Sequence, residues 1–186
     1  MQEFANPPSL RNGIFDLLSS VNLASDENVK LLDYTIQLFQ DNGLFSDYYG
    51  YHNVDHELEV TYVTLLSGIQ SLNDDYITAE DLNYLYAAAL LHDFDPAKAI
   101  DKPHEKNVIN FISKNKTIQK LLKQANLDQS LICALISRTV YPYKGEIMES
   151  TDKLIQSYFE KSNIKKNKKK QEHFRKLGHF LSVADR

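Results

Sequence analysis

The sequence predicts an all-α fold, a helical bundle of one domain, and three observations lead to this prediction. Apolar residues recur at intervals of three or four along most of the chain, which is the period of a helix. Only six glycines and five prolines occur in 186 residues, too few for a sandwich or barrel with a turn every ~8–12 residues. No useful stretch alternates as a strand would. The length suits one domain, so we expect a single core built from residues 1–186.

Three helices are predicted in the first half of the chain, and residues 1–50 are expected to contribute N-terminal helices. The first runs over residues 25–43. The second follows Asn53, a residue type that caps helices, and carries an apolar stripe with helical steps. The third opens at Thr78 with Asp81 in the place of the usual capping-box Glu and is expected to continue through His92. The stripe of the second helix is Val54, Leu58, Tyr62, Leu65, Ile69 and Leu72.

Two Xaa-Pro pairs predict a loop after the third helix. Asp95-Pro96 and Lys102-Pro103 bracket it, because a residue before proline is disfavoured in the α region. Helical periodicity then resumes in five segments. These are expected near residues 104–114, 118–124, 129–139, 147–159 and 171–184.

Composition excludes several classes of protein. The longest apolar runs fall far short of the roughly 20 residues of a membrane span, and the N-terminus shows no signal-peptide pattern. Cys133 is the only cysteine, so no intrachain disulfide can form, and a cytoplasmic location is expected. Residues 161–186 carry nine Lys or Arg against two Asp or Glu. Six of the nine lie between Lys161 and Lys170, and we interpret that run as a solvated loop rather than a nucleic-acid contact, because no aromatic residue lies among its lysines.

Histidines and aspartates mark the candidate site. His52 and His56 are four residues apart and share a helix face. His92-Asp93 ends the apolar run LYAAALL, where a polar pair needs a partner. A divalent metal ion is one such partner, since imidazole and carboxylate together suit borderline ions. Each piece alone has a structural alternative: an ordinary amphipathic helix for the first pair, and a histidine that complements the helix dipole for the second.

Taken together, the pattern resembles the HD superfamily of metal-dependent phosphohydrolases. The three matching blocks are YHNVDHELEV from Tyr51, LLHDFD from Leu90 and SVADR from Ser182. The first is similar to the Tyr-His-Asn-x-x-His motif of the cyclic-nucleotide phosphodiesterase branch. The resemblance covers residues 51–186.

The resemblance implies an HD-type fold and a specific set of site residues. His56, His92, Asp93 and Asp185 match the family's metal ligands, and His52 matches its proton donor to the leaving oxygen. By the same resemblance Asp93 could bridge to a second ion. Two features differ from the phosphodiesterase branch: Pro96 and the two residues after it stand where that branch has His-Pro-Gly, and the chain is too short for its purine-gripping region. HD domains usually continue beyond the aspartate that Asp185 matches. One expectation is therefore that the sequence is truncated after Arg186.

The expected activity is hydrolysis of a phosphate ester by metal-activated water. One or two ions of Mn, Mg, Fe, Zn or Ni are expected, and a nucleotide or cyclic-nucleotide type of ester is the leading substrate class. Lys98, Lys102 and Arg138 are candidate phosphate contacts, while His104 or Asp95 could help to hold a second ion. We expect no membrane or nucleic-acid partner; a homo-oligomer is left open.

Two other classes of function are kept as alternatives. One is a non-catalytic HD-like metal-binding, sensor or scaffold module, which would keep the metal ligands but not turn over an ester. The other is a hemerythrin-like di-iron bundle, but the chain contains no Glu-x-x-His motif of the kind such sites use.

Overall fold

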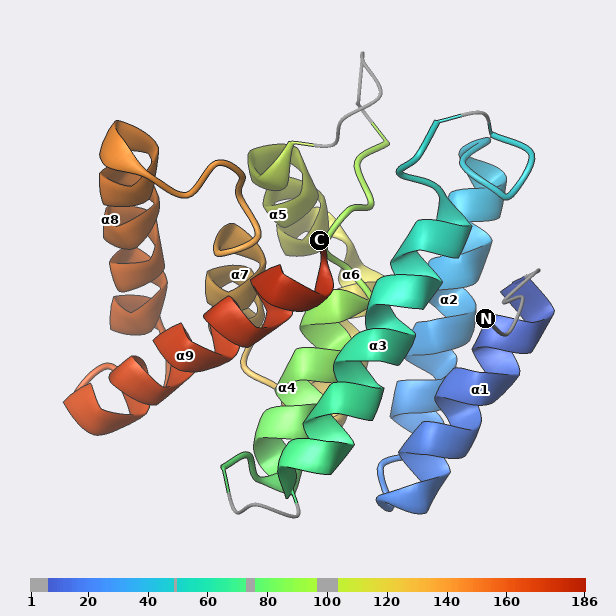
Figure 1. Ribbon diagram of the computed structural model, residues 1–186, viewed down its shortest axis with the longest axis horizontal. Coiled ribbons are helices and arrows are strands. Elements are labelled where there is room, and N and C mark those ends of the chain that lie inside the picture. Colours follow the sequence, from blue (N-terminus) through green and yellow to red (C-terminus); the bar gives the residue numbers. More distant parts are fainter. Residues whose placement is uncertain (1–6, 49, 73–75, 97–103) are drawn as a thin grey trace.

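The computed structural model describes residues 7–48, 50–72, 76–96 and 104–186. Over these residues the chain forms nine helices and no strand, which confirms the prediction of an all-α fold. Figure 1 shows their arrangement. The helices are α1 (Pro7–Ser20), α2 (Asp26–Asp41), α3 (Val54–Leu72), α4 (Ala79–Ala89), α5 (Glu105–Lys114), α6 (Lys116–Gln124), α7 (Gln129–Ser137), α8 (Gly145–Lys161) and α9 (Lys168–Ala184).

Local capping signals set several helix starts as predicted. The side chain of Asn53 accepts hydrogen bonds from the backbone N–H groups of Asp55 and His56 in the first turn of α3. Thr78 and Asp81 form the expected reciprocal capping box at the start of α4. Both starts are therefore fixed by residues next to them in the sequence.

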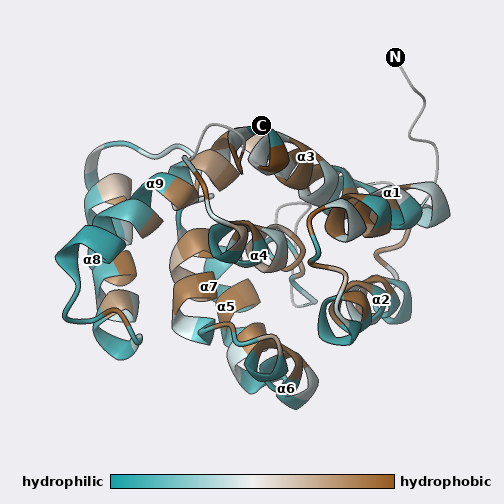
Figure 2. Ribbon diagram, turned by 90° about the horizontal axis from the view of Figure 1, so that it is seen from below, coloured by the Kyte–Doolittle hydropathy of each residue, from teal (hydrophilic) through white to brown (hydrophobic). Residues whose placement is uncertain are grey.

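The core is centred on α4 and α7. All seven residues from Leu131 to Ser137 are buried in α7, and the three alanines Ala87, Ala88 and Ala89 are fully buried in α4. Helix α3 packs against α1 and α4, while α7 packs against α4, α8 and α9. Figure 2 shows apolar residues on α7 in the interior, whereas α8 at the edge is mostly hydrophilic.

Small residues allow α3 and α4 to lie close together. A Cβ added at Gly68 of α3 would stand only 2.5 Å from Leu82 Cδ1 of α4. Helix α9 crosses the molecule so that its C-terminal end comes close to the start of α3 (Figure 1). This crossing brings the last residues of the chain to the segments that carry the predicted site.

The predicted loop after the third helix lies only partly in the described residues, since 97–103 fall outside them. No helix in the described part of the chain is long and apolar enough to cross a membrane.

Candidate metal centre

The four predicted metal ligands meet at one place, which three separate elements build. His56 lies in the first turn of α3, His92 and Asp93 follow the end of α4, and Asp185 caps the end of α9. One ligand atom from each of the four lies within 4.8 Å of the others, so this group could hold a metal ion. We call these four residues the His/Asp cluster.

His92 and Asp93 are not helical, contrary to the expectation that the helix continues through His92. Helix α4 ends at Ala89, with Leu90 as its C-cap, and the pair lies in the following turn. The imidazole Nδ1 of His92 lies 2.7 Å from the Ala89 carbonyl oxygen. A carbonyl oxygen released at a helix end needs a donor, and the histidine side chain supplies it in place of a further turn.

That contact also fixes which nitrogen of His92 faces the cluster. A carbonyl oxygen can only accept, so Nδ1 carries the proton and the neutral ring keeps its lone pair on Nε2. Nε2 lies 3.0 Å from Asp185 Oδ1. Two acceptors at this distance repel unless a proton or a cation stands between them. An Nδ1–H bonded to a backbone carbonyl is the usual support of a metal-ligating histidine.

His56 presents a similar unmet need. Its Nε2 atom is buried and makes no hydrogen bond of good geometry, although Asp93 Oδ2 and Asp185 Oδ1 lie 3.2 Å and 3.4 Å away. A buried imidazole nitrogen facing two carboxylates is a donor set that suits a borderline divalent cation. The residues present therefore fit a bound metal.

The protonation equilibria reflect this concentration of opposite charges. Burial disfavours the charged form of His56, but the nearby carboxylates of Asp185 and Asp93 outweigh it and raise the pKa to about 9. His92 has a pKa well above its usual value, because the nearby carboxylates outweigh its burial. Burial opposes ionisation of Asp93, yet His92 and His52 hold the pKa of its carboxyl well below the usual range. Without a metal, protons on the imidazoles neutralise the two carboxylates.

His52 stands beside the cluster rather than in it. Its Nδ1 lies 2.7 Å from Asp93 Oδ2, so the imidazole donates to that carboxylate. Its side chain is about one quarter exposed, whereas that of His92 is fully buried. A cavity of about 430 Å³ opens over the cluster, and we call it the cluster pocket. It is lined by His52, Asp93, Glu105, Thr139, Tyr141, Asp185 and Arg186.

Two residues near the site were missed by the sequence analysis. Glu57 is completely buried, and its Oε1 lies 3.4 Å from His92 Nδ1. Burial raises the pKa of its carboxyl, and His92 partly offsets this. Its position three residues after Val54 on the buried stripe of α3 was the available signal. Arg186 supplies a cation to the cluster pocket, and its guanidinium lies over the Tyr141 ring.

Of the three candidate phosphate contacts, only Arg138 lies in the described part of the chain. Lys98 and Lys102 lie outside the described residues. Arg138 stacks its guanidinium on Tyr143, with 3.5 Å to the ring centroid, and its Nη2 lies 3.3 Å from a nitrogen of His179. It is not among the residues that line the cluster pocket.

The two candidates for a second ion hold the start of α5. Asp95 is fully buried and accepts hydrogen bonds from the backbone N–H of His104 and from Asn107 Nδ2. His104 is exposed, and its Nδ1 accepts from the Lys106 backbone N–H as the N-cap of α5. Neither belongs to the group of described residues that could hold a metal.

Comparison of the chain with models of known families, with curated proteins and with solved structures gives no match in any of the three. The molecule is thus defined by what it contains: an all-helical fold with a buried cluster of two histidines and two aspartates that could hold a metal ion.

Proposed function

We propose that this protein is a metal-dependent phosphohydrolase with an HD-type helical domain, and that it hydrolyses a phosphate ester of the nucleotide class. One observation carries the proposal: the His/Asp cluster forms from three distant segments in the order His, His-Asp, Asp that the family resemblance implies. A structural role alone does not require two imidazole nitrogens and two carboxylates to converge at such distances.

The cluster would hold the metal through His56, His92, Asp93 and Asp185. A divalent cation bound there lowers the pKa of water and neutralises charge on a phosphoryl oxygen. The turn after α4 and the cap of α9 keep the carboxylates in place. The fixed Nδ1–H bond of His92 to Ala89 keeps its Nε2 available as a ligand.

His52 is the proposed general acid. Its Nδ1–H bond to Asp93 orients the ring, and Nε2 would be the atom that gives a proton to a leaving alkoxide. The side chain lines the cluster pocket, where a substrate would bind. Arg186 lines the same pocket and would contact an anionic phosphate.

The test begins with elemental analysis of the purified protein. Protein loaded separately with Mn²⁺, Mg²⁺, Fe²⁺, Zn²⁺ and Ni²⁺ is then assayed on nucleoside monophosphates and cyclic nucleotides. We expect bound metal and turnover with at least one ion, both lost in Asp185→Ala. His173→Ala, a change on the same helix at a residue that pairs with Asp81 instead, is the matched control. Metal binding without turnover of any ester would instead support a non-catalytic sensor or scaffold.

A further inference from the structure

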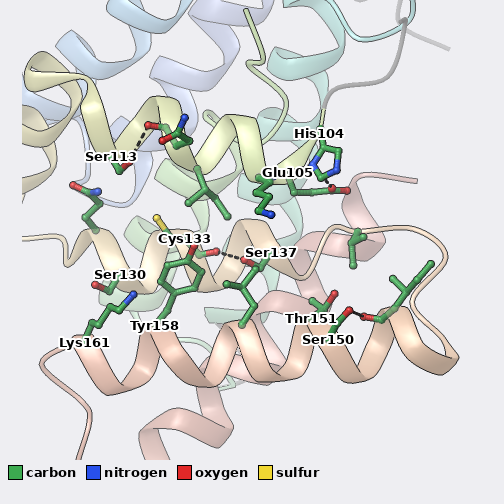
Figure 3. Close-up of a pocket in the computed structure, with 17 residues that line it drawn as sticks. His104, Glu105, Ser113, Ser130, Cys133, Ser137, Ser150, Thr151, Tyr158 and Lys161 are labelled. Atoms are coloured by element: carbon green, nitrogen blue, oxygen red, sulfur yellow. Dashed lines mark hydrogen bonds and ion pairs between the residues drawn. The ribbon is translucent and has the colours of Figure 1, made fainter. Parts of the chain in front are cut away.

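A second cavity, of about 620 Å³, lies between α5, α7 and α8. Helix α8 packs mainly on α7, and the three helices leave a groove with α7 as its floor. Figure 3 shows Cys133 and Ser137 on α7, with Tyr158 reaching toward them from α8. We call this cavity the α5–α7–α8 groove. Its volume lies within the range of about 300–1,000 Å³ that small-molecule sites occupy.

The lining of the groove suits an uncharged organic group rather than a phosphate. Most of its exposed surface is apolar although many of its lining residues are polar, and several serine hydroxyls donate their hydrogens to their own helices. Ser137 Oγ donates to the Cys133 carbonyl and Ser150 Oγ to that of Ile147, so these oxygens face a ligand mainly as acceptors. Among the residues that the structure describes, its lysines are Lys106 and Lys161, and no arginine lines it. The apolar residues of the lining are Ile109, Cys133, Val140, Ile147, Leu154 and Tyr158.

The groove adjoins the cluster pocket. Glu105 lines both cavities. The segment after α7 forms part of the border between the two cavities. Thr139 and Tyr141 line the cluster pocket, and Val140, which stands between these two residues in the sequence, lines the groove. In Figure 3 Glu105 lies toward one end of the groove and Lys161 toward the other. A molecule with its phosphate at the cluster would pass Glu105 to reach the groove.

We propose that the α5–α7–α8 groove binds the organic part of the substrate, and that this part is an uncharged, ring-containing alcohol with hydrogen-bond donors. The inference rests on the proposed phosphohydrolase function and names its substrate class. A flat ring can lie against Tyr158 and the aliphatic side chains, while hydroxyl or amino donors meet the serine oxygens. The exposed edges of Ile147 and Leu154, each about 40% accessible, are then covered by the ligand.

A binding measurement tests the groove without turnover. The chain contains no tryptophan, so Tyr158→Trp introduces a single tryptophan, whose emission can be excited apart from that of the tyrosines, in the groove. Adenosine and ribose are the probes, since they share the sugar and differ by an aromatic ring system. We expect adenosine to shift the emission of Tyr158→Trp in a saturable way, and ribose to leave it unchanged. Tyr76→Trp, at an exposed position outside the groove, is the control and should respond to neither.

A substitution in the groove tests its part in the reaction. Leu154 lines the groove and Met148 does not, although both lie on α8 with nearly equal exposure of 40% and 38%. A lysine placed against an apolar ring would have to lose its hydration. Leu154→Lys should raise KM for adenosine monophosphate about tenfold and leave KM for ribose phosphate unchanged. Met148→Lys should alter neither.

The outcomes separate the two proposals. Turnover of adenosine monophosphate and ribose phosphate with equal kcat/KM, unaffected by Leu154→Lys, would overturn the groove inference and leave the phosphohydrolase intact. No turnover of any phosphate ester with any metal would overturn the proposed function, and the inference with it. A saturable adenosine signal together with a selective KM effect in Leu154→Lys supports both.

Discussion

Asp93 links the proposed metal site to the proposed proton donor. Its Oδ2 lies 2.7 Å from His52 Nδ1 and 3.2 Å from His56 Nε2, so one carboxylate contacts both histidines of the first predicted block. Beneath it, the buried Glu57 faces His92. A change at His52 is therefore expected to impair proton transfer without loss of the metal, whereas a change at Asp93 should affect both.

Replacement of a ligand should remove the metal. In His92→Ala and Asp93→Ala we expect bound metal to fall to background, because each change deletes one of four ligands. Activity should fall in parallel. Metal content is measured by elemental analysis after dialysis, with His173→Ala as the control for loss of a histidine outside the cluster. Full metal content in both variants would contradict the ligand assignment.

His52 should matter in proportion to the basicity of the leaving group. His52→Ala is expected to slow hydrolysis of a nucleoside ester by ~10²–10⁴-fold, the usual contribution of a positioned acid. A p-nitrophenyl ester, whose leaving group needs little help from a proton, should be largely spared. Both rates and the metal content are measured on the same preparation.

Equal losses on both esters with metal retained would argue against the general-acid role of His52. Loss of the metal would instead make His52 a ligand or its support.

At the scale of the elements, the close packing of α3 on α4 sets the distance between two of the proposed metal ligands. Gly68 faces Leu82 at a distance that leaves no room for a methyl group, and both residues are buried. Since His56 starts α3 and His92 follows α4, any shift between these helices changes the distance between two proposed ligands.

Gly68→Ala should therefore destabilise the fold despite the better helix propensity of alanine. Overpacking a buried contact costs about 1–3 kcal/mol, against a propensity gain of about 1 kcal/mol. We expect a net loss of up to about 2 kcal/mol, measured by urea unfolding. Ser67→Ala, one residue away and half-buried, is the control and should change stability by less than about 0.5 kcal/mol. Unchanged or increased stability of Gly68→Ala would mean that Leu82 can move aside.

The single cysteine offers a further check on α7. Burial raises the pKa of the Cys133 thiol to about 12, so very little thiolate forms near neutral pH. We expect slow alkylation in the native protein at pH 8 and rapid alkylation in denaturant, followed by mass spectrometry. Equal rates in both conditions would show that α7 opens readily.

At the scale of the whole molecule, the cluster joins the C-terminal helix α9 to the start of α3 and the turn after α4. Asp185 at the end of α9 meets His92, which lies 93 residues earlier in the chain. The carboxylates and imidazoles are buried to different degrees but are all removed from bulk water in part. Because these groups come from distant parts of the chain, their mutual attraction acts only when the whole chain is folded.

A divalent metal should stabilise the whole protein by mass action. A ligand that binds only the folded state adds about 2.7 kcal/mol at a hundredfold excess over its Kd. We expect the melting temperature to rise with the bound ion and to fall when a chelator is added, as followed by circular dichroism. Asp185→Ala should abolish this response. A melting temperature that ignores both metal and chelator would contradict metal binding at the cluster.

Much of the helical pattern could be read from the sequence, because helices and caps depend on near neighbours. Asn53, Thr78 and Asp81 bond to groups within three residues of themselves, and the apolar periods follow from the geometry of one helix. The predicted end of helix α4 at His92 was wrong because that prediction also relied on near neighbours alone. The apolar periodicity continues to His92, but the Ala89 carbonyl accepts a hydrogen bond from the His92 imidazole instead.

The residue types of the site were also available from the sequence, whereas their meeting was decided by tertiary packing. Asp185 reaches His56 and His92 only because α9 crosses toward α3 and α4. The burial of Glu57, the place of Arg186 in the cluster pocket and the groove beside α8 likewise depend on which helices pack together. Such contacts join residues far apart in the chain, and local periodicity carries no information about them.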